Sequence, residues 1–223
     1  MGLNQRQHSN RAFISIVQGK FAKRVTEDTV GAIKRIIKNK NDGSEKIVWE
    51  IIYDDVSGII ESLEINEDGQ FGDQLKINME DIGEQFTVTL SMSGREAKNF
   101  LCLLKNIKLS EPVILSPYNF TSKDDGRQVI GMSTMQGGVG KEFKVKPYFS
   151  KETPNGLPQV PEGADKDEFK LTMKQQEIYL KKWVKKFVED NFKEAKPESK
   201  MQPNKSAEKI YTNASPDSGD LPF

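Results

Sequence analysis

The stretch Leu75-Lys76-Ile77-Asn78-Met79 and the stretch Phe86-Thr87-Val88-Thr89-Leu90-Ser91-Met92 decide the fold class. In both, apolar side chains take every second position, which is typical of a strand with one buried face. After these stretches, apolar residues recur at helical spacing: Ala97, Phe100, Leu101 and Leu104. Ser93 and Glu96 have the spacing of a capping box at the start of a helix. We therefore expect two strands followed by one helix over about 93–108.

Further strands are predicted on both sides of this helix. β-Branched and aromatic runs between turn signals predict strands at about 13–25, 30–37, 47–53, 59–65, 113–120, 127–134 and 142–149. Short strands interrupted by one helix before the last strands indicate a small closed barrel. Their order resembles the OB-fold, a five-stranded Greek-key barrel that binds oligonucleotides. Other barrels and sandwiches remain alternatives.

The predicted organisation is mainly β, with two additions after the barrel. Residues 1–151 are expected to form an OB-like nucleic-acid-binding domain with one internal helix, and 152–171 a linker rich in Pro and Gly. An amphipathic helix is predicted over 172–196, with a capping box at its start and Pro197 after its end. Its apolar stripe either packs on the barrel, forms a homodimer contact or docks another protein. Residues 197–223 are polar and lack apolar periodicity, so a disordered tail is expected.

Composition excludes several classes of site. The 223 residues include one Cys and one His, too few for an intramolecular disulfide or a Cys/His zinc site. No secretory signal or membrane-length apolar run is seen, which predicts a soluble cytoplasmic protein without membrane contact. No catalytic residue, cofactor or metal ligand is predicted.

The net charge is zero, but it is unevenly distributed along the chain. Residues 1–40 carry nine basic and two acidic side chains, 41–96 three basic and fourteen acidic, and 97–151 nine basic and four acidic. Such asymmetry permits a basic face that binds a polyanion.

Basic and aromatic residues alternate between Lys141 and Phe149. As a strand, this segment would place Lys144, Lys146 and Tyr148 on one face. Cations for phosphates and rings for bases are what a single-strand groove needs. The alternative is an ordinary strand with a solvated lysine face.

Other residues are candidates for the same groove. The proposed cations are Lys34, Arg35, Arg127 and Lys141, and the proposed stacking rings are Tyr118 and Phe120. Each cation taken singly is better explained as solvated surface, and each ring is equally well explained by core packing. Trp49 and Tyr53 share a strand face with Ile47 and Ile51, so we expect them in the barrel core.

The chain ends in Asp220-Leu221-Pro222-Phe223, three residues after Asp217. A large apolar ring beside carboxylates suits a partner with an apolar pocket and a basic rim. This end resembles the acidic tip of bacterial and phage single-stranded DNA-binding proteins. Ser218 and Gly219 stand where that family has more acids. The resemblance implies that the tip recruits replication or recombination proteins such as polymerase, primase or helicase.

The leading hypothesis is therefore a non-enzymatic protein that binds single-stranded DNA and recruits partners through its tip. The resemblance leans towards a phage-encoded protein, which would act in the cytoplasm of a bacterial host. One alternative is a metal-dependent nuclease or recombination enzyme that uses Asp54, Asp55 or Asp73. Another is an interaction adaptor without affinity for DNA.

Overall fold

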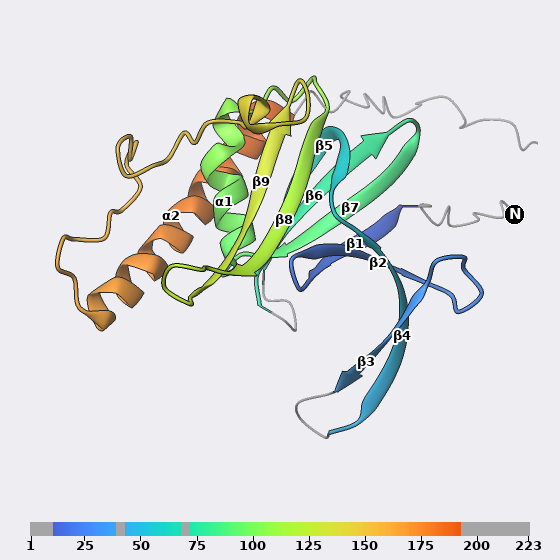
Figure 1. Cartoon of the computed structure of the whole chain (residues 1–223). Coiled ribbons are helices and arrows are strands. Elements are labelled where there is room, and N and C mark those ends of the chain that lie inside the picture. Colours follow the sequence, from blue (N-terminus) through green and yellow to red (C-terminus); the bar gives the residue numbers. More distant parts are fainter. Residues whose placement is uncertain (1–10, 39–42, 68–71, 193–223) are drawn as a thin grey trace, which may run out of the picture. The chain divides into compact units, whose positions relative to one another are not determined.

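The computed structural model describes residues 11–38, 43–67 and 72–192. Nine strands form a single mixed sheet in the order β3-β4-β2-β1-β7-β6-β5-β8-β9. They are β1 (Ala12–Val17), β2 (Lys20–Val25), β3 (Ile33–Lys38), β4 (Glu45–Tyr53), β5 (Val56–Asn66), β6 (Gln74–Asp81), β7 (Glu84–Ser91), β8 (Val113–Thr121) and β9 (Gln128–Gln136). The sheet curls into a half-barrel, so the expectation of a mainly β, barrel-like fold is confirmed (Figure 1).

The centre of the sheet is a Greek key. β5, β6 and β7 form an antiparallel meander, the helix α1 (Arg95–Leu103) follows, and β8 returns to pair antiparallel with β5. The resulting spatial order, β8-β5-β6-β7, is that of a Greek key. β1 adds to the free side of β7 in parallel orientation. The two alternating stretches that predicted strands are β6 and β7, and the strand–strand–helix order is confirmed.

Two helices cover one side of the half-barrel (Figure 1). α1 continues into a short 3-10 helix, Leu104–Asn106, and packs against β7 and β9, whereas α2 (Lys166–Phe192) packs against β5 and α1. The apolar stripe of α2 is buried in the core through Leu180, Val184 and Phe187. The first of the three alternatives for this helix, packing on its own sheet, is therefore the observed one. Neither α1 nor α2, the two α-helices of the described ranges, is long and apolar enough to span a membrane.

The predicted start of the second helix is wrong. α2 begins at Lys166 because Asp165 caps it: its carboxylate accepts the amides of Asp167 and Glu168, both at 2.8 Å. The Glu168 carboxylate accepts the amide of Asp165 at 3.1 Å, which completes a capping box seven residues before the predicted one. The Thr172 hydroxyl instead donates to the Glu168 carbonyl within the helix. Residues 166–171, expected in the linker, are therefore helical.

The predicted cap of the first helix also differs. Gly94 is the N-cap of α1, and no side chain caps it. The Ser93 hydroxyl lies 3.0 Å from that of Ser91 and so bonds back to the end of β7. The helix forms without the capping box because Ala97, Phe100 and Leu101 are fully buried.

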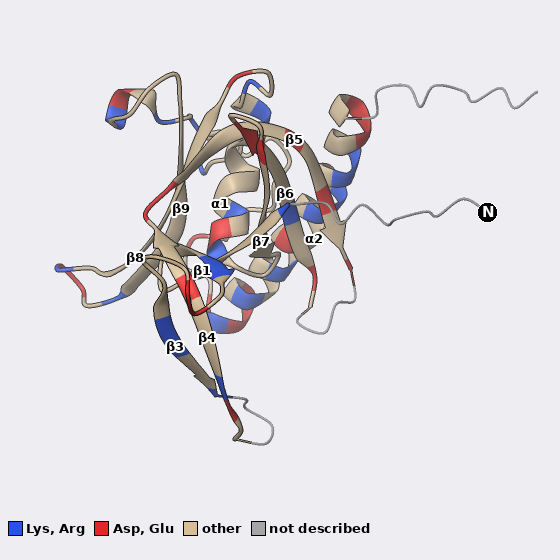
Figure 2. Ribbon diagram, turned by 90° about the vertical axis from the view of Figure 1, so that its right-hand side faces the viewer, with Lys and Arg blue, Asp and Glu red and all other residues tan. Residues whose placement is uncertain are grey.

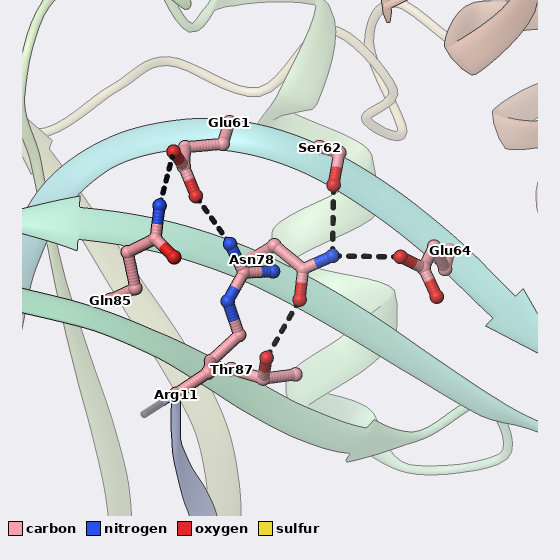
Figure 3. Close-up of polar contacts among 7 residues, drawn as sticks. All are labelled: Arg11, Glu61, Ser62, Glu64, Asn78, Gln85 and Thr87. Atoms are coloured by element: carbon pink, nitrogen blue, oxygen red, sulfur yellow. Dashed lines mark hydrogen bonds and ion pairs between the residues drawn. The ribbon is translucent and has the colours of Figure 1, made fainter. Parts of the chain in front are cut away.

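A buried amide joins the three strands of the meander (Figure 3). Asn78 is 3% exposed and donates to the Ser62 hydroxyl at 2.8 Å and to the Glu64 carboxylate at 2.9 Å. It accepts a hydrogen bond from the Thr87 hydroxyl at 2.7 Å. Both N–H groups and the oxygen of the Asn78 amide are hydrogen-bonded, so its burial adds stability rather than a desolvation cost.

The same sheet surface fixes the segment before β1 (Figure 3). The Arg11 guanidinium pairs with the Glu61 carboxylate at 2.6 Å, and the Gln85 amide donates to the other oxygen at 3.2 Å. One carboxylate on β5 thus holds both β7 and the start of β1.

The turn between β1 and β2 presses against β8. Gln18 and Gly19 both have positive φ, 51° and 77°, as in the two-residue type I′ turns that match the twist of a hairpin. A Cβ built on Gly19 would lie 2.5 Å from the backbone nitrogen of Asn119 in β8. Only glycine therefore allows the β1–β2 hairpin to approach β8 this closely.

We predict that Gly19→Ala costs about 2–4 kcal/mol of unfolding free energy, from left-handed strain and from the clash with β8. Gly31→Ala is the matched control, because Gly31 has a similar φ of 81° but no atom within 4 Å of a built Cβ. It should lose only about 1 kcal/mol. Urea unfolding of both variants measures the difference, and equal losses would show that the contact with β8 contributes nothing.

Candidate nucleic-acid interface

β3 and β4 form an arm that extends from the body of the sheet, and basic residues lie along β3 (Figures 1 and 2). At the base of the arm is a depression of about 390 Å³. It is lined by Val17, Gln18, Lys20, Ile33, Lys34, Arg35, Glu50 and Ile52. The strand register places Lys20, Arg35 and Glu50 on one face of the sheet, whereas the side chain of Lys34, which is opposite Trp49, lies on the other face. Cations and exposed aliphatic side chains thus meet in one concave surface.

Arg35 is fixed by a buried carboxylate in this depression. Its Nε and Nη2 donate to the two oxygens of Glu50, each at 2.7 Å, and Glu50 is 1% exposed. This two-point bond raises the pKa of Arg35 above its ordinary value. Arg35 presents a fixed positive group, but the carboxylate beneath it offsets part of its attraction for a phosphate.

Lys34 differs from its neighbour. Its side chain is exposed, and no carboxylate in the described ranges pairs with it. Lys20, on the other wall of the depression, pairs with the exposed Asp54. Exposed pairs of this kind are weak, so a polyanion can displace Asp54 from Lys20 at little cost.

The strand that carries the two predicted stacking rings passes next to the depression. The β1–β2 turn that carries Gln18 touches the backbone of Tyr118 and the Asn119 side of β8, which is the face opposite the two rings. The rings of Tyr118 and Phe120 lie 5.9 Å apart at an interplanar angle of 42°, and Phe120 is 54% exposed. The two rings share one face of β8 near its end. Accessible rings and cations are the components of a single-strand groove.

Arg127 lies at the same end of the β8–β9 hairpin, directly before β9. Its side chain is largely exposed, and its Nε is 3.4 Å from the Asp125 carboxylate. We call the set Lys20, Arg35, Tyr118, Phe120 and Arg127 the arm-side surface. Four of the nine predicted binding residues belong to it, and a fifth, Lys34, lies on the other face of β3.

The other four predicted residues lie at the opposite end of β9, about 27 Å away for a nine-residue strand. The predicted strand over 142–149 is wrong: Lys141–Phe143 is a 3-10 helix, and a single bridge joins Lys144 to Met135. After this bridge the chain bonds to α1 and to the 3-10 helix that follows it. The Cys102 carbonyl accepts the amide of Tyr148 at 2.8 Å, and the Asn106 side chain donates to the Lys146 carbonyl. Lys144, Lys146 and Tyr148 therefore share no strand face.

Tyr148 belongs to an aromatic cluster under α2. Its ring meets Phe149 edge-on at 4.8 Å and stacks with Trp183 at 6.5 Å. Phe149 is buried and also contacts Tyr179. This packing occupies the faces that a base would need.

The expectation that Trp49 and Tyr53 lie in the core is also wrong. They share a face of β4 with Ile47, which is 52% exposed, and Tyr53 is 36% exposed. The buried residues of β4 are Val48 and Glu50. The signal that sequence reasoning missed is a single carboxylate inside the apolar run 47–53, which requires a basic partner if it is buried.

Asp73, one of the acidic residues named for the nuclease alternative, pairs with α2. Lys181 bridges Glu67 and Asp73 at 2.6 and 2.5 Å and so ties α2 to the β5–β6 connection. Its hydrogen bonds raise the pKa of Lys181, and those from Lys181 and Lys185 lower the pKa of Glu67. Among the described residues, no three His, Cys, Asp or Glu side chains form a group that would hold a metal ion.

The predicted partner-binding tip, Asp217, Asp220, Leu221, Pro222 and Phe223, lies outside the described residues. The chain matches no family model, no curated protein and no solved structure.

We predict that Arg35→Met costs about 2 kcal/mol of unfolding free energy, because it leaves the Glu50 carboxylate buried without a counter-charge. This figure is below the roughly 3–5 kcal/mol of a fully buried pair because the Arg35 side chain is 36% exposed. Lys34→Met removes the same charge one residue away and should change stability by less than about 0.5 kcal/mol. Urea unfolding at neutral pH separates the two, and a neutral effect of Arg35→Met would contradict the structural role of the pair.

Proposed function

We propose that this protein binds single-stranded DNA with little sequence preference and is not an enzyme. The observation that carries the proposal is the arm-side surface, which combines Lys20 and Arg35 at the depression with the Tyr118–Phe120 ring pair on β8, the strand that the β1–β2 turn contacts. Lysine and arginine neutralise phosphates, and exposed rings stack on unpaired bases. A duplex hides the faces of its bases, so rings add affinity only for a single strand.

The topology supports the same proposal. A Greek-key meander with a helix before the returning strand, completed by β1 as a fifth strand, is compatible with an OB-like barrel. In this interpretation β3 and β4 are an addition to the barrel that extends its binding surface. The tip Asp220-Leu221-Pro222-Phe223 would separately recruit replication or recombination proteins, as its resemblance implies.

The direct test is a titration with a dT oligonucleotide of about 30 nucleotides, longer than the roughly 4–16 that one OB-fold occupies. Trp fluorescence is followed at two salt concentrations. We expect binding that weakens as salt rises and that duplex DNA of the same length does not compete away. Absence of binding at low salt, or equal affinity for duplex DNA, would reject the proposal.

A pair of ring variants shows which end of β9 binds. Phe120→Ala should weaken binding by about 1–3 kcal/mol, the cost of one lost base stack. Phe143→Ala is the control, because Phe143 is also partly exposed, at 36%, but lies at the opposite end of β9 beside Lys141 and Lys144. If affinity falls with Phe143→Ala and not with Phe120→Ala, the interface lies at the Lys141 end of β9 and the arm-side surface is not the binding site.

A further inference from the structure

A second and larger cavity lies between the two helices and the β8–β9 hairpin. Its volume is about 740 Å³, within the range of roughly 300–1,000 Å³ that is typical of ligand sites. The buried side chains Met92, Leu101 and Leu180 contribute to its apolar lining. We call it the interhelical pocket.

The ionisable groups of this pocket are mostly basic. α1 contributes Arg95 and Lys98, and α2 contributes Lys170, Lys174 and Glu177. Lys170 is engaged at the surface by Asp167 at 3.5 Å, whereas no carboxylate of the described chain pairs with Lys98 or Lys174. The pocket therefore combines an apolar interior with an excess of positive charge, and this combination suits a ligand that is both aromatic and anionic.

Lys98 is the central group of this charge. It is half-buried, and its Nζ donates to the Gln176 carbonyl oxygen at 2.5 Å and lies 3.5 Å from the Met173 sulfur. Gln176 is itself 5% exposed, and its amide donates to the Pro158 carbonyl, which fixes the orientation of its oxygen towards Lys98. Burial lowers the pKa of Lys98 because the charged ammonium group loses solvation. An anion bound in the pocket would stabilise that charge.

Two rings border the pocket, and one of them also belongs to the arm-side surface. Phe169 of α2 is 47% exposed, and Tyr118 lies on the opposite wall. A Cβ on the buried Gly131 would come within 2.4 Å of the Tyr118 hydroxyl and 2.3 Å of the Asn99 side chain. The absence of that Cβ lets the Tyr118 ring lie across β9 towards α1. Tyr118 thus lines the pocket and also contacts Phe120, so the two surfaces are continuous.

We propose that the interhelical pocket is a second subsite for the same single strand, which enters it over Phe120 and Tyr118. A base packs between Tyr118 and Phe169, and its flanking phosphates bind Lys98 and Lys174. The strand therefore extends beyond the arm-side surface and onto the helical side of the molecule. This inference rests on the proposed function, since it requires that the protein binds single-stranded DNA.

The test measures how the affinity of the full-length protein for the dT oligonucleotide depends on salt. The variant Lys98→Gln/Lys174→Gln should lower the slope of log affinity against log salt by about 0.7 for each lost phosphate contact. Lys182→Gln/Lys186→Gln is the control, because it removes the same charge from exposed positions of α2 that do not line the pocket. Its slope should match the wild type more closely than the pocket variant does.

The outcomes separate this inference from the proposed function. If the wild type binds dT and the pocket and control variants have equal slopes, the pocket is not on the strand's path and the arm-side surface stands alone. If the wild type does not bind dT, both proposals fall. Should Lys98→Gln prevent folding, Arg95→Gln/Lys174→Gln replaces it, since both side chains are exposed.

An aromatic, acidic peptide is the competing ligand for such a pocket. A free peptide with the sequence of residues 217–223 is titrated against the wild type and the pocket variant. If the peptide requires Lys98 and Lys174 while the salt slope for dT does not, the pocket is a peptide site and the inference is overturned. We expect the reverse, with the slope for dT dependent on both lysines.

Discussion

The close approach of the β1–β2 turn to β8 is the constraint on which the rest of the structure depends. β1 joins the sheet through β7, several strands away from β8 in the sheet order. The sheet must therefore curl until Gly19 meets Asn119, and the missing side chain at residue 19 sets how far it can curl. The core fills the space that this curvature encloses, with Phe21 fully buried next to the turn. Because β4 pairs with β2, the position of the arm relative to β8 follows from the same contact.

That constraint also relates the two proposed parts of the binding surface. Arg35 and Phe120 are 85 positions apart in the chain, and six other strands separate β3 from β8 in the sheet order. Curvature brings the strands that carry them to one side, with the β1–β2 turn between them. Tyr118 then connects this surface to the interhelical pocket. A flat sheet with the same strand order would separate these groups by the width of several strands.

Strong periodicity made the central part of the fold predictable from the sequence. The alternation in 75–79 and 86–92 identified β6 and β7 because one face of each is fully buried, and the stripe of α2 was recognised for the same reason. The segment 142–149 shows the limit of this reasoning. It alternates like a strand, but beyond one bridge to β9 its hydrogen bonds go to Cys102 and Asn106, which belong to helical segments and not to a neighbouring strand. For the site, the types of residue were predictable, whereas their division between the two ends of β9 depends on tertiary pairing. The partner of Glu50 was not predictable for the same reason.

The buried Asn78 specifies the register of β5, β6 and β7. Its neighbours Ile77 and Met79 face the core and are fully buried, so Asn78 faces the opposite side of the meander. If β6 slipped by one residue against β5 or β7, the amide would enter the core without partners, and an apolar side chain would face Ser62 and Thr87. Hydrophobic alternation alone penalises such a slip, but it does not distinguish slips by two residues, which preserve the pattern. The hydrogen-bonded series Ser62–Asn78–Thr87 excludes slips by two residues, because its members are opposite one another in only one alignment. A single amide thereby selects one alignment of β5, β6 and β7 from several that are equally hydrophobic.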